Sequence, residues 1–376
     1  MCIVLLTVIL KVTNKCNLKC PYCYNYSKTE ENRFFDLKNL NKLLNYMYEY
    51  DDNLTLIFHG GEPSLAGLEY YKKAIDIIKN FQYINKCKIK LCMQSNFTVN
   101  NDELWKFLIA NEVNIGTSFD GFLNENTRTK TQNYLNNKEK FESVNVGNSC
   151  IMIVNKNNYR KLKESLDYFF ACCFEKVELH NVYHTKTINN EYGIVEVDDL
   201  IEVYKELYKY ICGFDNKTPF DNFFEEYLNI INNNTNSLPC EKIDCRYKWI
   251  GIQPNGDYVP CGQEWNQNDD YVFGNIKDLS IKEVFLSDSY FTFSNKIQKH
   301  IEECLKKKCE IFPYCIGGCP AKNLANTGSI ENIDENYCKF NKEIIKFLYK
   351  YNKDNIDNIK NKNIRKYIIG HEIYGL

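Results

Sequence analysis

The chain has 376 residues, with 47 Lys and Arg against 49 Asp and Glu, and 44% of its residues are hydrophobic. These values are typical of one or two globular domains with a sizeable core, and they give no basic excess that would mark nucleic acid as the partner. No run of 18 apolar residues occurs, so we expect no membrane span. The 18 cysteines do not indicate a disulfide-rich secreted protein, because that class is small and residues 1–10 lack the basic start and the cleavage site of a signal peptide. We expect a cytoplasmic protein whose cysteines bind metal or take part in catalysis.

The first notable stretch is an apolar run, residues 3–12, which predicts a buried strand. Three cysteines follow it within eight residues, Cys16, Cys20 and Cys23. Four-iron clusters are held by cysteine thiolates, so three thiolates on one loop would hold three irons and leave the fourth open. An open metal position is typical of catalytic metal sites. Half of a zinc site is the alternative, although no second pair of cysteines or histidines lies nearby.

Strands and helices alternate after this loop. The expected strands cover residues 54–58, 88–93, 113–118, 150–154 and 176–180, and the expected helices cover residues 36–50, 67–80, 101–110 and 159–170. This alternation predicts parallel strands joined by crossover helices. Polar residues follow three of the strands, at the end where barrels of this type build their active sites. The three segments are His59-Gly60-Gly61-Glu62-Pro63, Gln94-Ser95-Asn96 and Ser118-Phe119-Asp120-Gly121.

The first of these segments has a specific chemistry. Gly60 and Gly61 would let a ligand approach the backbone closely, and the Glu62 carboxylate could hold an ammonium group. The alternative is a turn with one exposed acid. Arg128, seven residues after Gly121, is either an anion-binding side chain or a solvated surface cation.

The second half of the chain begins with a helical pattern over residues 194–232 and an Asn-rich linker candidate over residues 232–237. Asn255-Gly256 between two apolar runs predicts a hairpin, and residues 341–351 predict a helix. Eight cysteines in this half would suffice for two fully ligated four-iron clusters, or alternatively for zinc ribbons. They are Cys240, Cys245, Cys261, Cys304, Cys309, Cys315, Cys319 and Cys338.

The first cysteine loop resembles the signature of the radical S-adenosylmethionine (radical SAM) enzymes, C-x3-C-x-aromatic-C, with Tyr22 as the aromatic residue. The resemblance implies an α/β fold, a partial (β/α)6 TIM-like barrel, and a [4Fe-4S] cluster on the three cysteines that binds S-adenosylmethionine. It also implies which side chains contact that cofactor. The implied set is Gly60, Gly61, Glu62 and Pro63 at its amino group, Gln94, Ser95, Asn96, Ser118 and Asp120 at its ribose or carboxylate, and Arg128 at its carboxylate.

The later cysteines resemble the SPASM domain, the auxiliary-cluster module of many radical SAM enzymes. Gly256-x4-Cys261 and Cys309-x5-Cys315-x3-Cys319 match its pattern, but Cys304 precedes Cys309 by four residues where the family has two. An insertion near Lys306-Lys307 would explain this departure. The resemblance implies one cluster on Cys240, Cys245, Cys261 and Cys319, and a second on Cys304, Cys309, Cys315 and Cys338. The expected domains are residues 1–232 for the barrel and following helices, 238–340 for the SPASM domain and 341–376 for a C-terminal helix and tail.

The resemblance implies an enzyme that abstracts hydrogen from a peptide or protein side chain, with flavodoxin or ferredoxin as electron donor. Our first hypothesis is a peptide maturase that forms a thioether or carbon–carbon link. The second is an anaerobic sulfatase maturase, which makes formylglycine. In that group an Asp follows the cysteine that matches Cys261 and acts as base, whereas Gly262 stands here, so Glu264 is the candidate catalytic residue. A non-catalytic metal scaffold is a third hypothesis.

Overall fold

The computed structural model describes residues 6–25, 33–51, 53–184, 190–232, 234, 240–263, 265 and 269–369. The chain divides into two compact units, and each is described by itself. The first unit comprises Met1–Ser118, Lys130–Phe141 and Cys245–Lys296. The second unit comprises Phe119–Thr129, Glu142–Asp244 and Ile297–Leu376.

The first unit is built on a mostly parallel sheet. Its strands are β1 (Leu6–Thr13), β2 (Leu54–Gly60), β3 (Ile89–Ser95), β4 (Asn114–Ser118), β7 (Trp249–Ile252) and β8 (Tyr258–Val259). They lie in the order β4, β3, β2, β1, β7, β8, and only the pair β7–β8 is antiparallel. Every residue of β1 is buried, as expected of a central parallel strand. Because β1 to β4 are parallel, the segments that follow them meet at one edge of the sheet.

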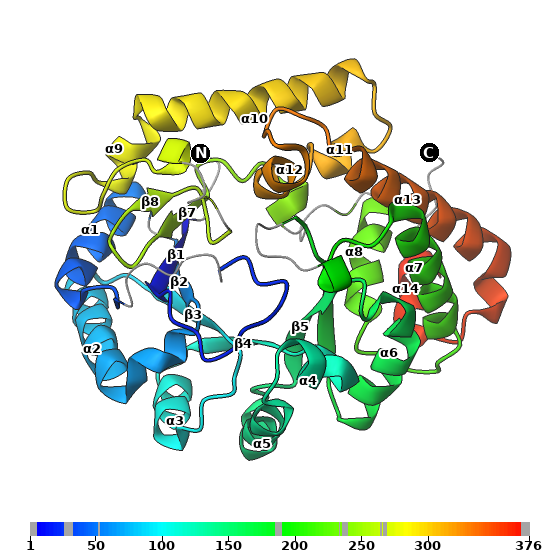
Figure 1. Ribbon diagram of the computed structural model, residues 1–376, viewed down its shortest axis with the longest axis horizontal. Helices are drawn as coiled ribbons and strands as arrows, with labels where there is room; N and C mark the ends of the chain where they lie inside the picture. Colours follow the sequence, from blue (N-terminus) through cyan, green and yellow to red (C-terminus); the bar gives the residue numbers. More distant parts are fainter. Residues whose placement is uncertain are drawn as a thin grey trace. The chain divides into compact units, whose positions relative to one another are not determined.

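Helices cover one side of these strands. Figure 1 shows α1, α2 and α3 following one another along β1 to β4. The α-helices of this unit are α1 (Leu40–Tyr50), α2 (Gly67–Asn85), α3 (Asp102–Ala110), α5 (Thr131–Phe141) and α9 (Ile281–Phe285), and α10 (Asp288–Lys306) begins in it. Side-chain caps begin two of the helical segments, since Asp36 accepts from Lys38 and Asn101 accepts from Leu104.

The second unit contains a parallel pair of strands, β5 (Ser149–Val154) and β6 (Lys176–Asn181), and a group of helices. The long helix α13 packs against α7 and α8, and the buried Tyr208 and Tyr227 hydroxyls donate to Asn352 and Asn341 of α13. The helices are α4 (Asn124–Thr127), α6 (Leu162–Ala171), α7 (Val197–Cys212), α8 (Asp221–Ile231), α11 (Phe312–Cys315), α12 (Pro320–Thr327), α13 (Glu335–Asn355) and α14 (Lys362–Ile369).

Short 3-10 turns connect many of these elements. They are η1 (Leu37–Asn39), η2 (Pro63–Ala66), η3 (Gly121–Leu123), η4 (Glu142–Val144), η5 (Tyr159–Lys161), η6 (Asn190–Tyr192), η7 (Cys240–Lys242), η8 (Asp269–Tyr271) and η9 (Ile356–Asn358). Within the described ranges, no helix is both long enough and apolar enough to span a bilayer.

The α/β class predicted from the strand and helix alternation is confirmed, and the expected elements lie within a few residues of their observed bounds. Several features were not predicted, among them the helices α5 and α14 and the three that follow. The strand β7 of the expected hairpin joins the main sheet beside β1, the helix α10 runs for 19 residues, and α13 is longer at both ends than residues 341–351. Most of the linker candidate, residues 233 and 235–237, lies outside the described residues.

Candidate active site

The cysteine loop leaves the carboxyl end of β1 and turns at once. The Cys23 N–H donates to the Cys20 carbonyl at 3.0 Å, which closes a tight turn between the second and third thiols. The Cys16 sulfur accepts from the Leu18 N–H at 3.5 Å and from the Asn96 side-chain amide at 3.8 Å. Desolvation by the surrounding protein raises the pKa of the Cys16 thiol to about 11. The negative charges of Glu62 and Cys23 raise this pKa further. A cation bound at the loop would offset this cost of ionisation.

Gly60 and Gly61 hold the start of this loop. A Cβ atom on Gly60 would lie 2.2 Å from the Thr13 carbonyl oxygen, and one on Gly61 would lie 2.2 Å from the Lys15 carbonyl oxygen. The Gly61 N–H donates to Thr13 at 2.8 Å and the Glu62 N–H donates to Lys15 at 2.7 Å. The expectation that the glycines leave room for a ligand is therefore corrected, because protein backbone fills that space. Glycine is needed so that β2 can dock the segment leading to Cys16.

The Glu62 side chain has no exposed surface, so the alternative of a turn with one exposed acid is wrong. One carboxylate oxygen accepts from the Ser64 N–H, the Ser64 hydroxyl and the Ser95 hydroxyl at 3.0, 2.6 and 2.8 Å. The other accepts from the Asn96 N–H at 2.6 Å. Burial raises the pKa of Glu62, while these hydrogen bonds oppose the rise. The carboxylate thus ties the ends of β2 and β3 together.

Asn96 connects the end of β3 to the cysteine loop. Its side-chain amide donates to Asn17 at 2.8 Å as well as to the Cys16 sulfur, and its side-chain oxygen accepts from the buried Thr98. The Asn17 amide donates to the Thr98 hydroxyl at 3.0 Å, which closes the network. Sequence reasoning missed Asn17 and Thr98, and only their contacts identify them. At the next strand ends, the Gln94 amide donates to the Ser118 hydroxyl at 2.9 Å.

Asp120 and Arg128 lie together in the second unit. Asp120 is fully buried and accepts from Arg128 at 3.1 Å, from the Thr127 hydroxyl at 2.7 Å and from the Ile153 N–H at 3.1 Å. The Arg128 side chain is only 12% exposed, so the alternative of a solvated surface cation is wrong. The ion pair anchors the segment around α4 to β5.

Four of the later cysteines form one group in the second unit. Cys304 is in electrostatic range of Cys309 and Cys338, and Cys315 is in range of Cys304 and Cys309. Burial, followed by the charges of these neighbours, raises the pKa of Cys304, Cys315 and Cys338 to about 11 each. Because the charges of these thiols oppose one another's ionisation, a bound cation would offset that cost, and thiolates are the ligands that iron–sulfur clusters use. Cys304 is in the group although its spacing departs from the family pattern.

Cys240 and Cys319 are both in electrostatic range of the Lys322 ammonium in the same unit. Lys322 pairs with Glu241 at 2.6 Å, which lowers the pKa of Glu241 to about 2. A second lysine, Lys242, is 3% exposed and lies 3.8 Å above the centre of the Tyr227 ring. The burial of Lys242 gave no signal in the sequence, because it depends on tertiary contacts.

Cys245 and Cys261 belong to the first unit. The Cys261 carbonyl packs against β7, where a Cβ on Gly251 would lie 2.4 Å from its oxygen. Gly262 is buried, and a Cβ there would lie 3.0 Å from the Ile9 side chain of β1. The Trp265 N–H donates to the Cys261 sulfur at 3.1 Å. Glu264, the predicted catalytic residue, lies outside the described residues.

A buried lysine and a neutral histidine lie side by side at the end of the sheet. Lys11 of β1 is opposite His59 of β2, has no exposed surface and donates to Asn25 at 3.2 Å. The Asn25 amide donates to the Gly60 carbonyl at 2.8 Å. The His59 Nδ1 accepts from the Gly60 N–H at 2.8 Å, so its proton is on Nε2. Burial and the Lys11 charge lower the pKa of His59 from 6.5 to about 4.

This shift makes stability depend on pH. The unfolded chain binds a proton at His59 below pH 6.5, whereas the folded chain does so only near pH 4. The free energy of unfolding should therefore decrease as the pH falls through this window. Urea unfolding at pH 7 and pH 5 measures the effect, and the His59→Gln variant should lose this part of the pH dependence. An unchanged pH dependence in the variant would contradict the assignment.

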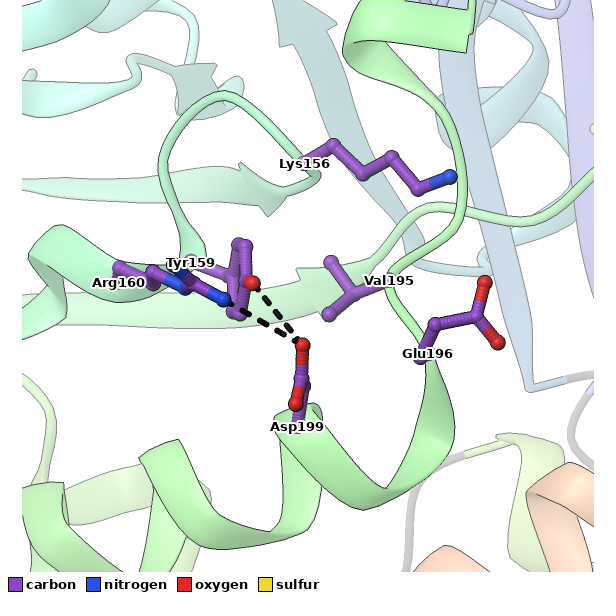
Figure 2. A pocket seen from close by; sticks show the side chains of 6 residues that line it. All are labelled: Lys156, Tyr159, Arg160, Val195, Glu196 and Asp199. Atoms are coloured by element: carbon purple, nitrogen blue, oxygen red, sulfur yellow. Dashed lines mark hydrogen bonds and ion pairs between the residues drawn. The ribbon is translucent and has the colours of Figure 1, made fainter.

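A cavity of about 320 Å³ lies in the second unit between the segment after β5 and the start of α7 (Figure 2). Asp199 accepts from the Tyr159 hydroxyl at 3.1 Å and pairs with Arg160 at 3.7 Å across its lining. None of the predicted site residues lines it. The cavity is therefore separate from the cysteine groups described above.

Single-ion metal sites were also sought. Among the described residues, no three His, Cys, Asp or Glu side chains converge closely enough to bind one metal ion. In a four-iron cluster each thiolate binds a different iron, so the sulfurs lie further apart than around one ion.

Comparisons with known proteins agree with this geometry. The family model of the radical SAM superfamily matches residues 10–169, and that of SPASM, an iron-sulfur cluster-binding domain, matches residues 240–310. A cysteine-type anaerobic sulfatase-maturating enzyme of Clostridium novyi (strain NT) is 24% identical over 375 residues, which cover 92% of this chain and 96% of that protein. The radical SAM cyclopropyl synthase TigE of Paramaledivibacter caminithermalis is 23% identical over 373 residues, 92% of this chain and 74% of that protein.

A solved structure described as native anSMEcpe with bound AdoMet is similar with a TM-score of 0.78 and 25% identity, covering 94% of this chain and all of that one. The two family models fall on the two cysteine-bearing regions that the sequence singled out, and the structural match confirms the partial barrel with a C-terminal cysteine-rich domain. The chain therefore carries a radical SAM domain and a SPASM iron–sulfur cluster-binding domain, and it is an enzyme.

Proposed function

We propose that this enzyme oxidises a Cys or Ser side chain of a peptide or protein substrate to formylglycine, as an anaerobic sulfatase maturase does. The observation that carries the proposal is the likeness to sulfatase-maturating enzymes over whole chains, 92% of this one and 96% of the relative. The peptide maturase was the first hypothesis from the sequence, and the sulfatase maturase was the second. The comparisons favour the sulfatase maturase, so we reverse this order.

The proposed cofactors are S-adenosylmethionine and three [4Fe-4S] clusters, with flavodoxin or ferredoxin as electron donor. Cys16, Cys20 and Cys23 would hold the cluster with the open iron, which supplies the electron that cleaves S-adenosylmethionine. The auxiliary clusters would accept the electron left on the substrate. Their proposed ligands are Cys240, Cys245, Cys261 and Cys319 for one cluster, and Cys304, Cys309, Cys315 and Cys338 for the other.

The protein residues have distinct tasks in this scheme. Gly60 and Gly61 fix the cysteine loop by backbone contact, and Glu62 fixes Asn96, which donates to the Cys16 sulfur. Such hydrogen bonds hold a sulfur ligand in one orientation and stabilise its negative charge. We propose the residues implied by the resemblance as the S-adenosylmethionine site, in which Gly60 and Gly61 act by docking the cysteine loop and not by leaving room for the ligand. The other members are Glu62, Pro63, Gln94, Ser95, Asn96, Ser118, Asp120 and Arg128.

The chain differs from the sulfatase maturases in its general base. The Asp that acts as base in those enzymes corresponds to Gly262 here, where an added Cβ would lie 3.0 Å from the Ile9 side chain. Ile9 thus fills the space that a longer side chain at position 262 would need. We propose Glu264 as the base instead, and the Glu264→Gln variant tests it. Full formylglycine formation by that variant would remove Glu264 from the mechanism.

The second candidate is a peptide maturase that forms a thioether or carbon–carbon link. Gly262 favours it, because such a reaction does not require the base of the sulfatase maturases. The likeness to the cyclopropyl synthase TigE over 92% of this chain also supports it.

One assay separates the two candidates. The reconstituted, anaerobically reduced enzyme is incubated with S-adenosylmethionine and three peptides that share a sulfatase sequence and carry Cys, Ser or Ala at the target position. We expect an aldehyde on the Cys or Ser peptide, detected by mass spectrometry and by hydrazide labelling, and none on the Ala peptide. Loss of two hydrogens without an aldehyde would favour the crosslinking candidate. Formation of 5′-deoxyadenosine with no change in any peptide would contradict the formylglycine proposal.

A further inference from the structure

The contact between Trp265 and Cys261 was not foreseen from the sequence. The indole N–H has one hydrogen and can only donate, and it donates to the Cys261 sulfur across 3.1 Å. The two residues are four positions apart, and both are in the first unit. Sulfur is a weak acceptor as a thiol and a much stronger one as a thiolate. The contact therefore gains strength when Cys261 is ionised or binds a metal.

The orientation of the indole ring is fixed by packing. Trp265 is 2% exposed, and its ring lies edge-on to Tyr271 at 5.1 Å and to Phe293 at 5.5 Å between centroids. Tyr271 and Phe293 also contact each other at 6.1 Å. A tryptophan held on two sides by rings has few alternative rotamers, so its N–H points at the sulfur without further ordering cost.

The backbone of Cys261 is fixed by packing as well. The Cys261 carbonyl lies so close to Gly251 of β7 that no side chain fits between them, and the next residue, Gly262, packs against Ile9 of β1. The backbone of Cys261 thus packs against β7, and the next residue packs against β1. Both partners of the hydrogen bond are rigid, which is what a residue that adjusts a metal centre requires.

We propose that Trp265 is a positioning residue whose hydrogen bond to the Cys261 sulfur raises the reduction potential of the auxiliary cluster that Cys261 helps to hold. The inference rests on the proposed function, because it takes Cys261 as a cluster ligand. Hydrogen bonds to cluster sulfurs are among the factors that set the potential of iron–sulfur clusters. A donor at the sulfur withdraws negative charge from the cluster and favours the form with one more electron. That effect would help this cluster to accept an electron from the substrate.

The test uses protein in which Cys16, Cys20 and Cys23 are replaced by alanine, so that only auxiliary clusters remain. Their midpoint potentials are measured by redox titration followed by electron paramagnetic resonance. Trp265→Phe removes the N–H donor and keeps an apolar ring. We expect one cluster to shift to a more negative potential, with unchanged iron content, while the other cluster keeps its potential as an internal reference.

Two matched proteins make the result specific. Phe293→Leu loosens the same aromatic packing but keeps the N–H donor, so its potentials should shift much less than those of the Trp265→Phe protein. Replacing Trp265 by benzothienylalanine exchanges only the indole nitrogen for sulfur, and it should reproduce the negative shift even where the phenylalanine variant loses iron. Unchanged potentials in both Trp265 variants with full iron would overturn the inference and leave the proposed function standing. Absence of any auxiliary cluster in the parent protein would overturn both.

Discussion

Replacing Cys16, Cys20 and Cys23 together by alanine should abolish cleavage of S-adenosylmethionine and remove about a third of the bound iron. The proposed ligand sets account for three four-iron clusters, so the iron content should fall from about twelve to about eight atoms per chain. The three thiols lie on the loop after β1, where the Cys23 N–H donates to the Cys20 carbonyl. The measurements are iron and sulfide content after anaerobic reconstitution and the yield of 5′-deoxyadenosine.

A matched control removes three other thiols. Cys87, Cys172 and Cys173 belong to none of the proposed ligand sets and are at least partly accessible. Their triple alanine variant should keep its full iron content and its 5′-deoxyadenosine yield. A Cys16, Cys20 and Cys23 variant that kept both would contradict the assignment of the first cluster.

Gly61→Ala should have the largest effect among single substitutions. Its Cβ would lie 2.2 Å from the Lys15 oxygen and 2.6 Å from the Lys15 carbonyl carbon, which are backbone atoms and cannot rotate away. The segment leading to Cys16 must shift, at a cost of about 3 kcal/mol in the free energy of unfolding. Because Lys15 directly precedes Cys16, the first cluster should also assemble poorly.

Urea unfolding of the apo-protein and the iron content of the reconstituted protein check this prediction. Gly213→Ala is the control, since its φ of −80° suits any residue and its nearest neighbour, the Tyr210 oxygen, lies 3.3 Å from the added Cβ. That variant should stay within about 1 kcal/mol of the parent and bind iron normally. Equal stability of the Gly61 and Gly213 variants would show that the loop is not docked through Gly61.

The location of the site could be predicted, because it depends on local patterns. Three cysteines after a strand and polar residues at the ends of the next strands identify one edge of a parallel sheet. The structure brings Cys16, Glu62 and Asn96 together there, since Asn96 donates hydrogen bonds to both Glu62 and the Cys16 sulfur. Cys304 lies within electrostatic range of Cys309 and Cys338, and its assignment to a cluster with them stays a prediction.

The structural roles of individual residues at the site could not be predicted, because they depend on contacts between segments that are far apart in the sequence. The glycines of the Gly-Gly-Glu-Pro segment were expected to admit a ligand, and they admit the segment before Cys16 instead. The burial of the Lys11 and Lys242 side chains was not predicted either. Trp265 became notable only when its N–H was found at the Cys261 sulfur.

The pairing of β7 with β1 shows the same limit for the fold. The hairpin of β7 and β8 is a local feature and was predicted from Asn255-Gly256. Its addition to the central strand joins residues about 240 positions apart, such as Thr7 and Trp249. No short pattern specifies such a pairing, yet it is what places Cys261 and Gly262 beside β1.

The most direct measurement is the electron paramagnetic resonance spectrum of the reduced, reconstituted enzyme with and without S-adenosylmethionine. Binding of the cofactor at an open iron of the Cys16, Cys20 and Cys23 cluster should change that cluster's signal, and 5′-deoxyadenosine should accumulate in the same sample. A spectrum that does not respond to S-adenosylmethionine, from protein with its full complement of iron and without 5′-deoxyadenosine, would contradict this account.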